Sequence, residues 1–263
     1  MEGEAFSPCI GRAVNRKGNE MNATSCFLAE LVGTALLILL GNGVVANVLL
    51  EKSGMKGGGS VQITFAWGLA VLLPAFVFGA ASGAHFNPAL TITLAADGSL
   101  APSLVGWYIA GQMLGAGIGA FLVWALYMRH FEATEDGALK RACFCTAPSI
   151  PCLPCNFLSE AVGTFVLVFA IKGIVQVQGI AGGVSYLLVF AIIVSIGMSL
   201  GGLTGYAINP ARDLGPRIVY ALLPMKNKAP ANWRYAWVPV LGPITGALAA
   251  VWLYKVFPWP TCG

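Results

Sequence analysis

The tripeptide Asn-Pro-Ala occurs twice, and its residue types suit the start of a helix that presents a polar group. Asn is a favoured N-cap because its side-chain oxygen accepts a hydrogen bond from the backbone of the first turn. Pro suits the first helical position, where its missing N–H is not needed. The sequence therefore predicts two helix starts, formed by Asn87, Pro88, Ala89 and by Asn209, Pro210, Ala211.

These capping residues predict a site for small neutral molecules. An Asn side chain that caps through its oxygen keeps its NH₂ group free to donate outward. A helix start also carries roughly half a positive charge. If the two starts face each other in one lumen, they attract the oxygen of water or an alcohol, and half-helix dipoles of this kind are a recognised barrier to protons and cations. One Asn-Pro-Ala alone would be a generic helix start, so the functional interpretation depends on two copies at matched places.

The elements that must position these caps have the composition of a membrane protein. Of the 263 residues, 57% are hydrophobic and only 10% are charged, whereas soluble domains carry about 25% charged residues. The net charge of +4 lies mostly in connections and tails and gives no sign of nucleic-acid binding. Six apolar runs are about long enough to cross a ~30 Å hydrocarbon core as helices. They are 27–50, 61–78, 104–128, 157–174, 184–200 and 235–257.

Two further apolar pieces, 87–96 and 209–220, are too short to span. At ~1.5 Å per residue, a helix of about ten residues covers only half of the membrane. Three landmarks recur in the same order in each half of the chain. They are the Ala-Glu-Leu-Val-Gly-Thr and Ser-Glu-Ala-Val-Gly-Thr segments at 29–34 and 159–164, the Asn-Pro-Ala segments at 82–89 and 204–211, and the Gly-containing runs at 114–120 and 241–247.

The repeat predicts how the spans are arranged. Each half carries three spans, an odd number, so the second half must enter the membrane from the opposite side, and its broken helix meets the first near the midplane. We expect an all-α membrane protein of six transmembrane helices and two re-entrant half-helices in an inverted repeat. The expected segments are a polar N-terminal tail (1–24), a first repeat (25–128), a connecting loop (129–156), a second repeat (157–258) and a C-terminal tail (259–263).

The extended segments before each cap cannot face lipid, because their carbonyl groups would lack hydrogen-bond partners there. Lining a water-filled pore would solve this problem. We therefore predict a ladder of carbonyl acceptors for a permeating hydroxyl group, formed by Gly83, Ala84, His85, Gly205 and Ala207.

Over residues 25–258 the sequence resembles the aquaporin (major intrinsic protein) family, in its glycerol-facilitator branch. The resemblance rests on Ser-Gly-Ala-His-Phe-Asn-Pro-Ala at 82–89 and Asn-Pro-Ala-Arg-Asp-Leu-Gly-Pro-Arg at 209–217. It implies one pore per subunit, a homotetramer in the lipid bilayer of the plasma membrane, cytoplasmic termini and no cofactor. The positive-inside rule does not support this orientation, because more Lys and Arg residues fall in the connections expected outside.

The resemblance assigns the narrow outer constriction to Trp67, Gly197, Tyr206 and Arg212. A guanidinium inside the bilayer is costly and is a functional candidate for that reason; the alternative for Arg212 is a structural ion pair with Asp213. Gly197 leaves room that Tyr206 can occupy, so two aromatic rings would form an apolar corner while Arg212 donates to hydroxyl groups. Either aromatic residue alone would suit the core or the membrane interface.

Three acidic residues complete the candidate site. Glu30 and Glu160 lie at matching places in the first and fourth spans and resemble the family's buried acids that hold the re-entrant loops. The alternative is a pair of proton or ion sites in a transporter. Asp213, directly after Arg212, resembles the glycerol-conducting members, although an acid in a first helical turn is also favourable by itself.

We predict a passive channel for glycerol, small polyols and other small neutral solutes, and water, which excludes ions and protons. A water-selective channel of the same fold is the main alternative. An ion-coupled transporter would need a charged binding site and alternating access. A membrane enzyme would need a nucleophile and a base, and no such pair is visible; the only histidines are His85 and His130.

Four cysteines lie within the connection between the two halves. Cys143, Cys145, Cys152 and Cys155 could together hold zinc, but their spacing is not a familiar zinc pattern. Disulfides and inert thiols are the other possibilities. We predict no metal site.

Overall fold

The computed structural model describes residues 22–177 and 182–259. Within these ranges the chain is helical and has no strand. Ten α-helices are α1 (Ala23–Leu49), α2 (Gly59–Ser82), α3 (Pro88–Ala96), α4 (Val105–Leu126), α5 (Met128–Ala133), α6 (Gly137–Ala142), α7 (Leu153–Gln176), α8 (Gly182–Thr204), α9 (Pro210–Leu222) and α10 (Val238–Val256). A 3₁₀ turn, Pro102–Leu104, leads into α4.

Six of these helices are long and apolar enough to cross a membrane: α1, α2, α4 with its 3₁₀ turn, α7, α8 and α10. They confirm the six predicted spans, and the chain is a multi-pass membrane protein. Helices α1, α2, α7 and α8 begin a few residues earlier than the apolar runs. For α1 the reason is a polar cap, because Asn22 accepts a hydrogen bond from the backbone N of Thr24 at 2.9 Å and so starts the helix.

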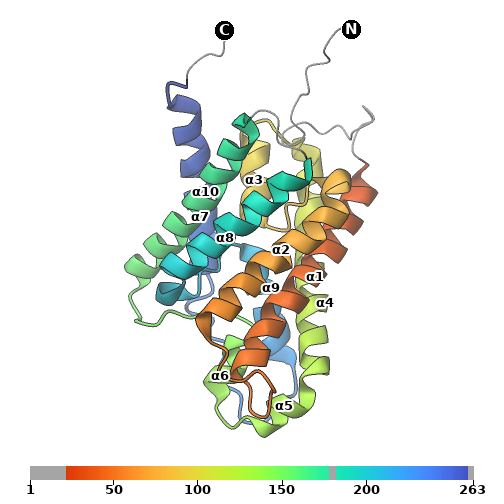
Figure 1. The fold of residues 1–263 in the computed structure, drawn as a ribbon, viewed down its shortest axis with the longest axis vertical. Helices are drawn as coiled ribbons and strands as arrows, with labels where there is room; N and C mark the ends of the chain where they lie inside the picture. The colour runs from red at the N-terminus through yellow and green to blue at the C-terminus, as the bar shows by residue number, and fades with distance from the viewer. Residues whose placement is uncertain (1–21, 178–181, 260–263) are drawn as a thin grey trace.

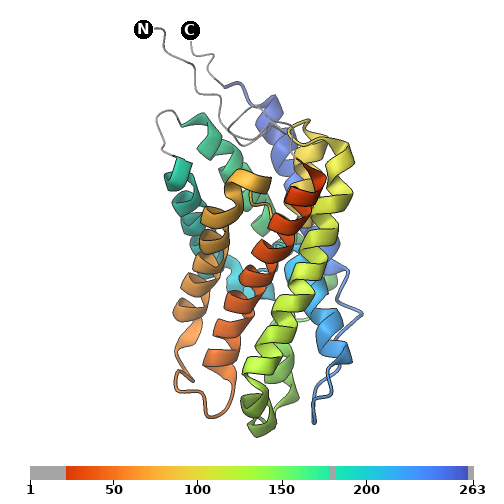
Figure 2. The same ribbon diagram turned by 90° about the vertical axis from the view of Figure 1, so that its right-hand side faces the viewer.

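The two half-helices, α3 and α9, enter the bundle from opposite ends. The long helices lie alongside one another, with α3 in the upper half of the bundle and α9 in the lower half (Figure 1). The connection that carries α5 and α6 lies at the end opposite to the end of α10, as the second view also shows (Figure 2). The half-helices α3 and α9 contain 9 and 13 residues, so each covers only part of the length of a spanning helix.

Helix packing follows the same scheme in both halves of the chain. Helix α1 packs on α4 and on α2, just as α7 packs on α10 and on α8. Each half-helix packs against the last long helix of the other half, α3 against α10 and α9 against α4, and α2 packs against α8. This exchange of half-helices is what an inverted repeat gives.

Glycines let the paired helices approach closely. A Cβ atom on Gly111 would lie 2.6 Å from the carbonyl oxygen of Phe27, and one on Gly119 would lie 2.5 Å from that of Ala35. On α10, a Cβ on Gly242 would lie 2.9 Å from Cβ of Glu160. Small residues at helix contacts are typical of membrane proteins, where van der Waals packing holds helices together.

The connection between the halves contains two short helices that we did not predict. Asp136 caps α6, and its Oδ1 accepts from the backbone N of Ala138 at 2.7 Å. The buried Lys140 donates from Nζ to the carbonyl oxygen of Lys226 at 2.6 Å. The connection is therefore tied to the segment that follows α9.

Candidate functional site

The two capping asparagines occupy the positions that the sequence predicts. Oδ1 of Asn87 accepts from the backbone N of Ala89 at 3.0 Å. Oδ1 of Asn209 accepts from the backbone N of Ala211 at 3.0 Å and of Arg212 at 3.2 Å. Pro88 and Pro210 begin α3 and α9; together these contacts satisfy N–H groups that a helix start leaves unpaired.

The amide groups of these caps also hold the two loops together. Nδ2 of Asn87 donates to the carbonyl oxygen of Ile208 at 2.8 Å, and Nδ2 of Asn209 donates to that of Phe86 at 2.7 Å. We expected the NH₂ groups to be free, but one of the two N–H donors of each is used in this crossed pair. The second donor of each remains for a molecule in the lumen.

The loops before the caps share one backbone conformation. In the first loop Gly83, Ala84 and Phe86 have positive φ angles of 79°, 56° and 49°, and the matching positions in the second loop have 80°, 35° and 44°. Those matching residues are Gly205, Tyr206 and Ile208. Non-glycine residues are rarely left-handed, and each such residue costs about 1–3 kcal/mol. The loops therefore need partners that hold them.

A buried glutamate holds each loop. Glu30 is fully buried and accepts from Oγ of Ser82 at 2.6 Å and from the backbone N of His85 and Phe86 at 3.0 and 2.7 Å. Nε2 of Gln112 donates to Glu30 as well, at 2.8 Å. The role of Gln112 could not be found from the sequence, because it depends on how α4 packs on α1.

Glu160 makes the corresponding contacts in the second half. It is fully buried and accepts from Oγ1 of Thr204 at 2.7 Å and from the backbone N of Ala207 and Ile208 at 3.0 and 2.8 Å. Protein donors thus engage both oxygens of each glutamate, an arrangement that suits loop support better than ion binding.

A cavity passes both asparagines and reaches Arg212. Of the predicted residues, it is lined by Trp67, Gly83, Ala84, His85, Asn87, Tyr206, Asn209 and Arg212. Gly205 and Ala207, which we predicted for the carbonyl ladder, are not among its lining residues. Much of the remaining wall is apolar and comes from α1, α2, α3, α7 and α8: Leu37, Val71, Ala75, Leu90, Leu167, Ile171, Val189 and Ile193. The sequence offers no signal for these residues beyond their place in an apolar span.

Arg212 stacks on Trp67 in the wall of the cavity. The central guanidinium carbon lies 4.1 Å from the centroid of the Trp67 ring, and both residues are buried. Stacking on an aromatic face stabilises a cation without using its N–H donors. These donors therefore remain available to a molecule in the cavity.

Asp213 pairs with Arg217 and not with Arg212. Oδ1 of Asp213 accepts from Nε of Arg217 at 2.8 Å, and Oδ2 accepts from the backbone N and Oγ1 of Thr146, both at 2.7 Å. Asp213 and Arg217 are fully buried. The ion pair considered for Arg212 does not form, and Arg212 makes no salt bridge within the described part of the chain.

Gly197 does not line the cavity but shapes it through Tyr206. A Cβ on Gly197 would lie 2.9 Å from Cζ of Tyr206. The Tyr206 ring thus occupies the space that the glycine leaves, as the sequence led us to expect.

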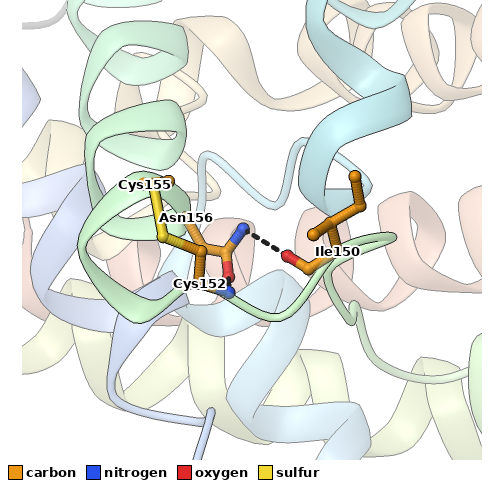
Figure 3. The surroundings of a disulfide bond; sticks show 4 residues. All are labelled: Ile150, Cys152, Cys155 and Asn156. Atoms are coloured by element: carbon orange, nitrogen blue, oxygen red, sulfur yellow. Dashed lines mark hydrogen bonds between the residues drawn. A yellow bond between two sulfur atoms is a disulfide. The ribbon is translucent and has the colours of Figure 1, made fainter.

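The four cysteines of the connection divide into two kinds. Cys152 and Cys155 form a disulfide at the start of α7 (Figure 3). Asn156 accepts from the backbone N of Cys152 at 2.9 Å and donates to the carbonyl oxygen of Ile150 at 3.2 Å. Cys143 and Cys145 are free, buried thiols. In the described ranges, no group of three or more His, Cys, Asp or Glu residues could hold a metal ion.

Comparison with known proteins agrees with this geometry. The family model of the major intrinsic protein matches residues 17–254. The probable glycerol uptake facilitator protein of Thermotoga maritima is 49% identical over 231 residues, which cover 88% of this chain and 98% of the relative. The glycerol uptake facilitator protein of Bacillus subtilis is 51% identical over 222 residues, 84% of this chain and 81% of the relative.

A solved structure has the same fold. The X-ray structure of the aquaglyceroporin from Plasmodium falciparum matches with a TM-score of 0.80 at 30% identity, covering 89% of this chain and 96% of that one. The family model spans nearly the whole chain, and relatives at about half identity cover most of it. The chain therefore belongs to the major intrinsic protein family.

Proposed function

We infer that this protein is a passive channel that conducts glycerol, other small neutral solutes and water. The observation that carries this conclusion is the part of the cavity wall formed by Trp67, Tyr206 and Arg212, where Arg212 has no carboxylate partner among the described residues. Two aromatic rings offer an apolar wall for a carbon chain, and the guanidinium offers donors for its hydroxyl groups. Relatives whose names describe glycerol uptake facilitators support this substrate.

We propose that the same residues exclude ions and protons. The guanidinium of Arg212, which lines the cavity, repels cations. Further along, the starts of α3 and α9 face it with Asn87 and Asn209, and each start adds roughly half a positive charge. Neutral solutes and water escape this barrier because they bring no charge into it.

The water-selective alternative is not favoured. The ring of Tyr206 occupies the space beside Gly197, and we propose that this position of the ring leaves the lumen wide enough for glycerol. The two acids considered for an ion-coupled transporter, Glu30 and Glu160, are not free, since protein donors engage both. We also propose no catalytic role for His85, whose Nδ1 lies 3.1 Å from Oγ1 of Thr91. These contacts support passive conduction.

We further propose a homotetramer in the plasma membrane with both termini on the cytoplasmic side. Support comes from the family resemblance and from large apolar side chains exposed on the long helices, among them Leu69, Leu73 and Phe76 of α2 and Trp107, Leu114 and Phe121 of α4. Such a surface needs lipid or a neighbouring subunit.

Two of the basic residues that conflict with the positive-inside rule, Lys140 and Lys228, have structural partners. Nζ of Lys228 donates to the carbonyl oxygens of Tyr220, Ala221 and Leu223 at 3.0, 2.8 and 2.7 Å, at the end of α9. Lys140 is tied to Lys226 in the same region. Backbone carbonyl groups hold the side chains of Lys140 and Lys228, so these two lysines say little about orientation.

Light scattering from proteoliposomes tests the proposed function. A jump in an impermeant osmolyte measures water efflux, and a jump in glycerol measures the re-swelling that follows glycerol entry. We expect both phases to be faster than in protein-free liposomes of the same lipid. Re-swelling no faster than in the protein-free control would overturn glycerol conduction, whatever the water phase shows.

A further inference from the structure

The ring of Tyr206 lies across two glycines of α8, not one. Gly197 and Gly201 are one helical turn apart and so share a face of the helix. A Cβ on Gly201 would lie 2.7 Å from Cδ1, 3.0 Å from Cε1 and 3.7 Å from Cγ of Tyr206. A Cβ on Gly197 would meet the other side of the ring, 2.9 Å from Cζ and 3.1 Å from Cε2.

Gly201 differs from Gly197 in what surrounds it. The nearest atom to a Cβ on Gly197 is Cγ2 of Thr64, at 2.6 Å, so a larger residue there would also press on α2. The three nearest atoms to a Cβ on Gly201 all belong to Tyr206. A substitution at Gly201 therefore acts on the Tyr206 ring first.

The ring of Tyr206 has no room to move on the side of α8, where it lies against Gly197 and Gly201. The backbone of this residue is left-handed, with φ 35°, and follows Gly205 with φ 80°. The hydroxyl at the tip of the ring is buried. Since the ring contacts α8 and also lines the cavity, it lies between the helix and the lumen. A push from α8 moves it into the lumen.

We propose that Gly201 is a specificity-determining residue of this channel, because the bare surface of Gly197 and Gly201 seats the Tyr206 ring and so sets the width of the constriction. The inference rests on the proposed glycerol conduction. Gly201 does not line the cavity and acts by positioning Tyr206. A ring displaced toward the Trp67–Arg212 pair obstructs a three-carbon solute more than it obstructs water, which is smaller.

The test is the glycerol-to-water permeability ratio of Gly201→Ala in proteoliposomes. We expect glycerol permeability to fall about tenfold, which corresponds to about 1.4 kcal/mol in the barrier, while water permeability falls less. Gly202→Ala is the matched control, because a Cβ at this neighbouring position of α8 meets nothing within 4 Å. It should keep the wild-type ratio.

The same substitution made in a Tyr206→Ala variant separates displacement of the ring from a general disturbance of α8. In Tyr206→Ala there is no ring to displace, so adding Gly201→Ala should leave glycerol permeability unchanged. An unaltered ratio in Gly201→Ala, or an equal loss with and without the Tyr206 ring, would overturn the inference. Wild-type protein that does not conduct glycerol would instead overturn the proposed function, so the two failures are distinguishable.

Discussion

At the scale of single residues, each charged side chain discussed at the site forms hydrogen bonds or an ion pair with protein groups, with the exception of Arg212. Asp213, Arg217, Glu30 and Glu160 bind protein groups, whereas the guanidinium of Arg212 rests on an aromatic ring and has no carboxylate partner in the described chain. A buried charge is costly unless it is paired. A buried guanidinium without a carboxylate partner is therefore expected where a permeating molecule supplies hydrogen-bond acceptors.

The Asp213–Arg217 pair should be essential for stability. Asp213→Asn removes a buried charge and leaves that of Arg217 uncompensated, which costs about 3–5 kcal/mol. Thermal unfolding in detergent should show a much lower midpoint. Asp136→Asn is the control: this exposed residue caps α6, and Asn caps as well as Asp. Equal midpoints for the two variants would contradict the structural role given to Asp213.

The loop-holding role of Glu30 can be tested in the same way. The NH₂ group of Gln cannot accept from the backbone N of Phe86, so Glu30→Gln leaves a buried donor unsatisfied at a cost of about 1–3 kcal/mol. We expect a lower unfolding midpoint than for Glu132→Gln, whose exposed pair with Arg129 contributes at most about 1 kcal/mol. A Glu30→Gln variant as stable as Glu132→Gln would remove Glu30 from the support of the loop.

The free thiols of the connection should be unreactive in the folded protein. Burial, and secondarily the charge of Asp213, raises the pKa of Cys145 to about 12, and burial also raises the pKa of Cys143. Only the thiolate reacts with iodoacetamide. After reduction at pH 8, peptide mass spectrometry should find label on Cys152 and Cys155 but not on Cys143 or Cys145. Labelling of all four in denaturant is the control, and equal native labelling would contradict their burial.

The same raised pKa gives a pH dependence of stability. A thiol whose pKa is higher in the folded state favours folding while it is protonated. This contribution is present below the ordinary thiol pKa of 9.0 and is lost as the pH rises toward about 12. Wild-type protein should therefore lose more stability over this range than Cys145→Ala, as measured by urea unfolding at each pH. Parallel losses in the two proteins would contradict the shift.

Among the helices, the half-helices were predicted best, because their signals are local. Asn followed by Pro marks a helix start by itself, and α3 and α9 begin where the sequence indicated. Helices α5 and α6 were missed because they are short and contain no apolar run; the cap Asp136 was the one available signal. Gln112, Arg217 and Thr146 could not be predicted as members of the site. Thr146 and Asp213, for example, are 67 positions apart, and only the folded chain brings them together.

The close packing of α4 on α1 gives a prediction for these helices. A Cβ on Gly115 would overlap the carbonyl oxygen of Leu31, so Gly115→Ala should destabilise the protein by about 1–3 kcal/mol. Gly117→Ala is the control, because its Cβ meets only Cγ2 of Val219, at 3.7 Å; it should be neutral or stabilising by up to about 1 kcal/mol. Thermal unfolding in detergent compares the two, and a Gly115→Ala variant at least as stable would show that α1 and α4 can separate freely.

For the whole molecule, a nearly symmetric framework carries an asymmetric constriction. The two loops share their backbone conformation, their glutamate contacts and their crossed asparagine bonds. At corresponding positions, however, the first loop has Ala84 and the second has Tyr206, and Leu90 follows the first Asn-Pro-Ala where Arg212 follows the second. The framework thus positions a lumen, and we propose that a few unmatched side chains in its wall determine what passes.

The measurement that tests this account most directly is the glycerol-to-water permeability ratio of Gly197→His beside wild type, in proteoliposomes of equal protein content. A Cβ at this position would lie 2.6 Å from Cγ2 of Thr64 and 2.9 Å from the Tyr206 ring, so an imidazole must displace the ring, press on α2 or enter the lumen. We expect wild type to pass both solutes, and the variant to lose at least about tenfold in glycerol permeability, or about 1.4 kcal/mol in the barrier, while water permeability falls much less. Equal ratios in the two proteins would contradict the claim that the Gly197–Tyr206 contact makes this channel wide enough for glycerol.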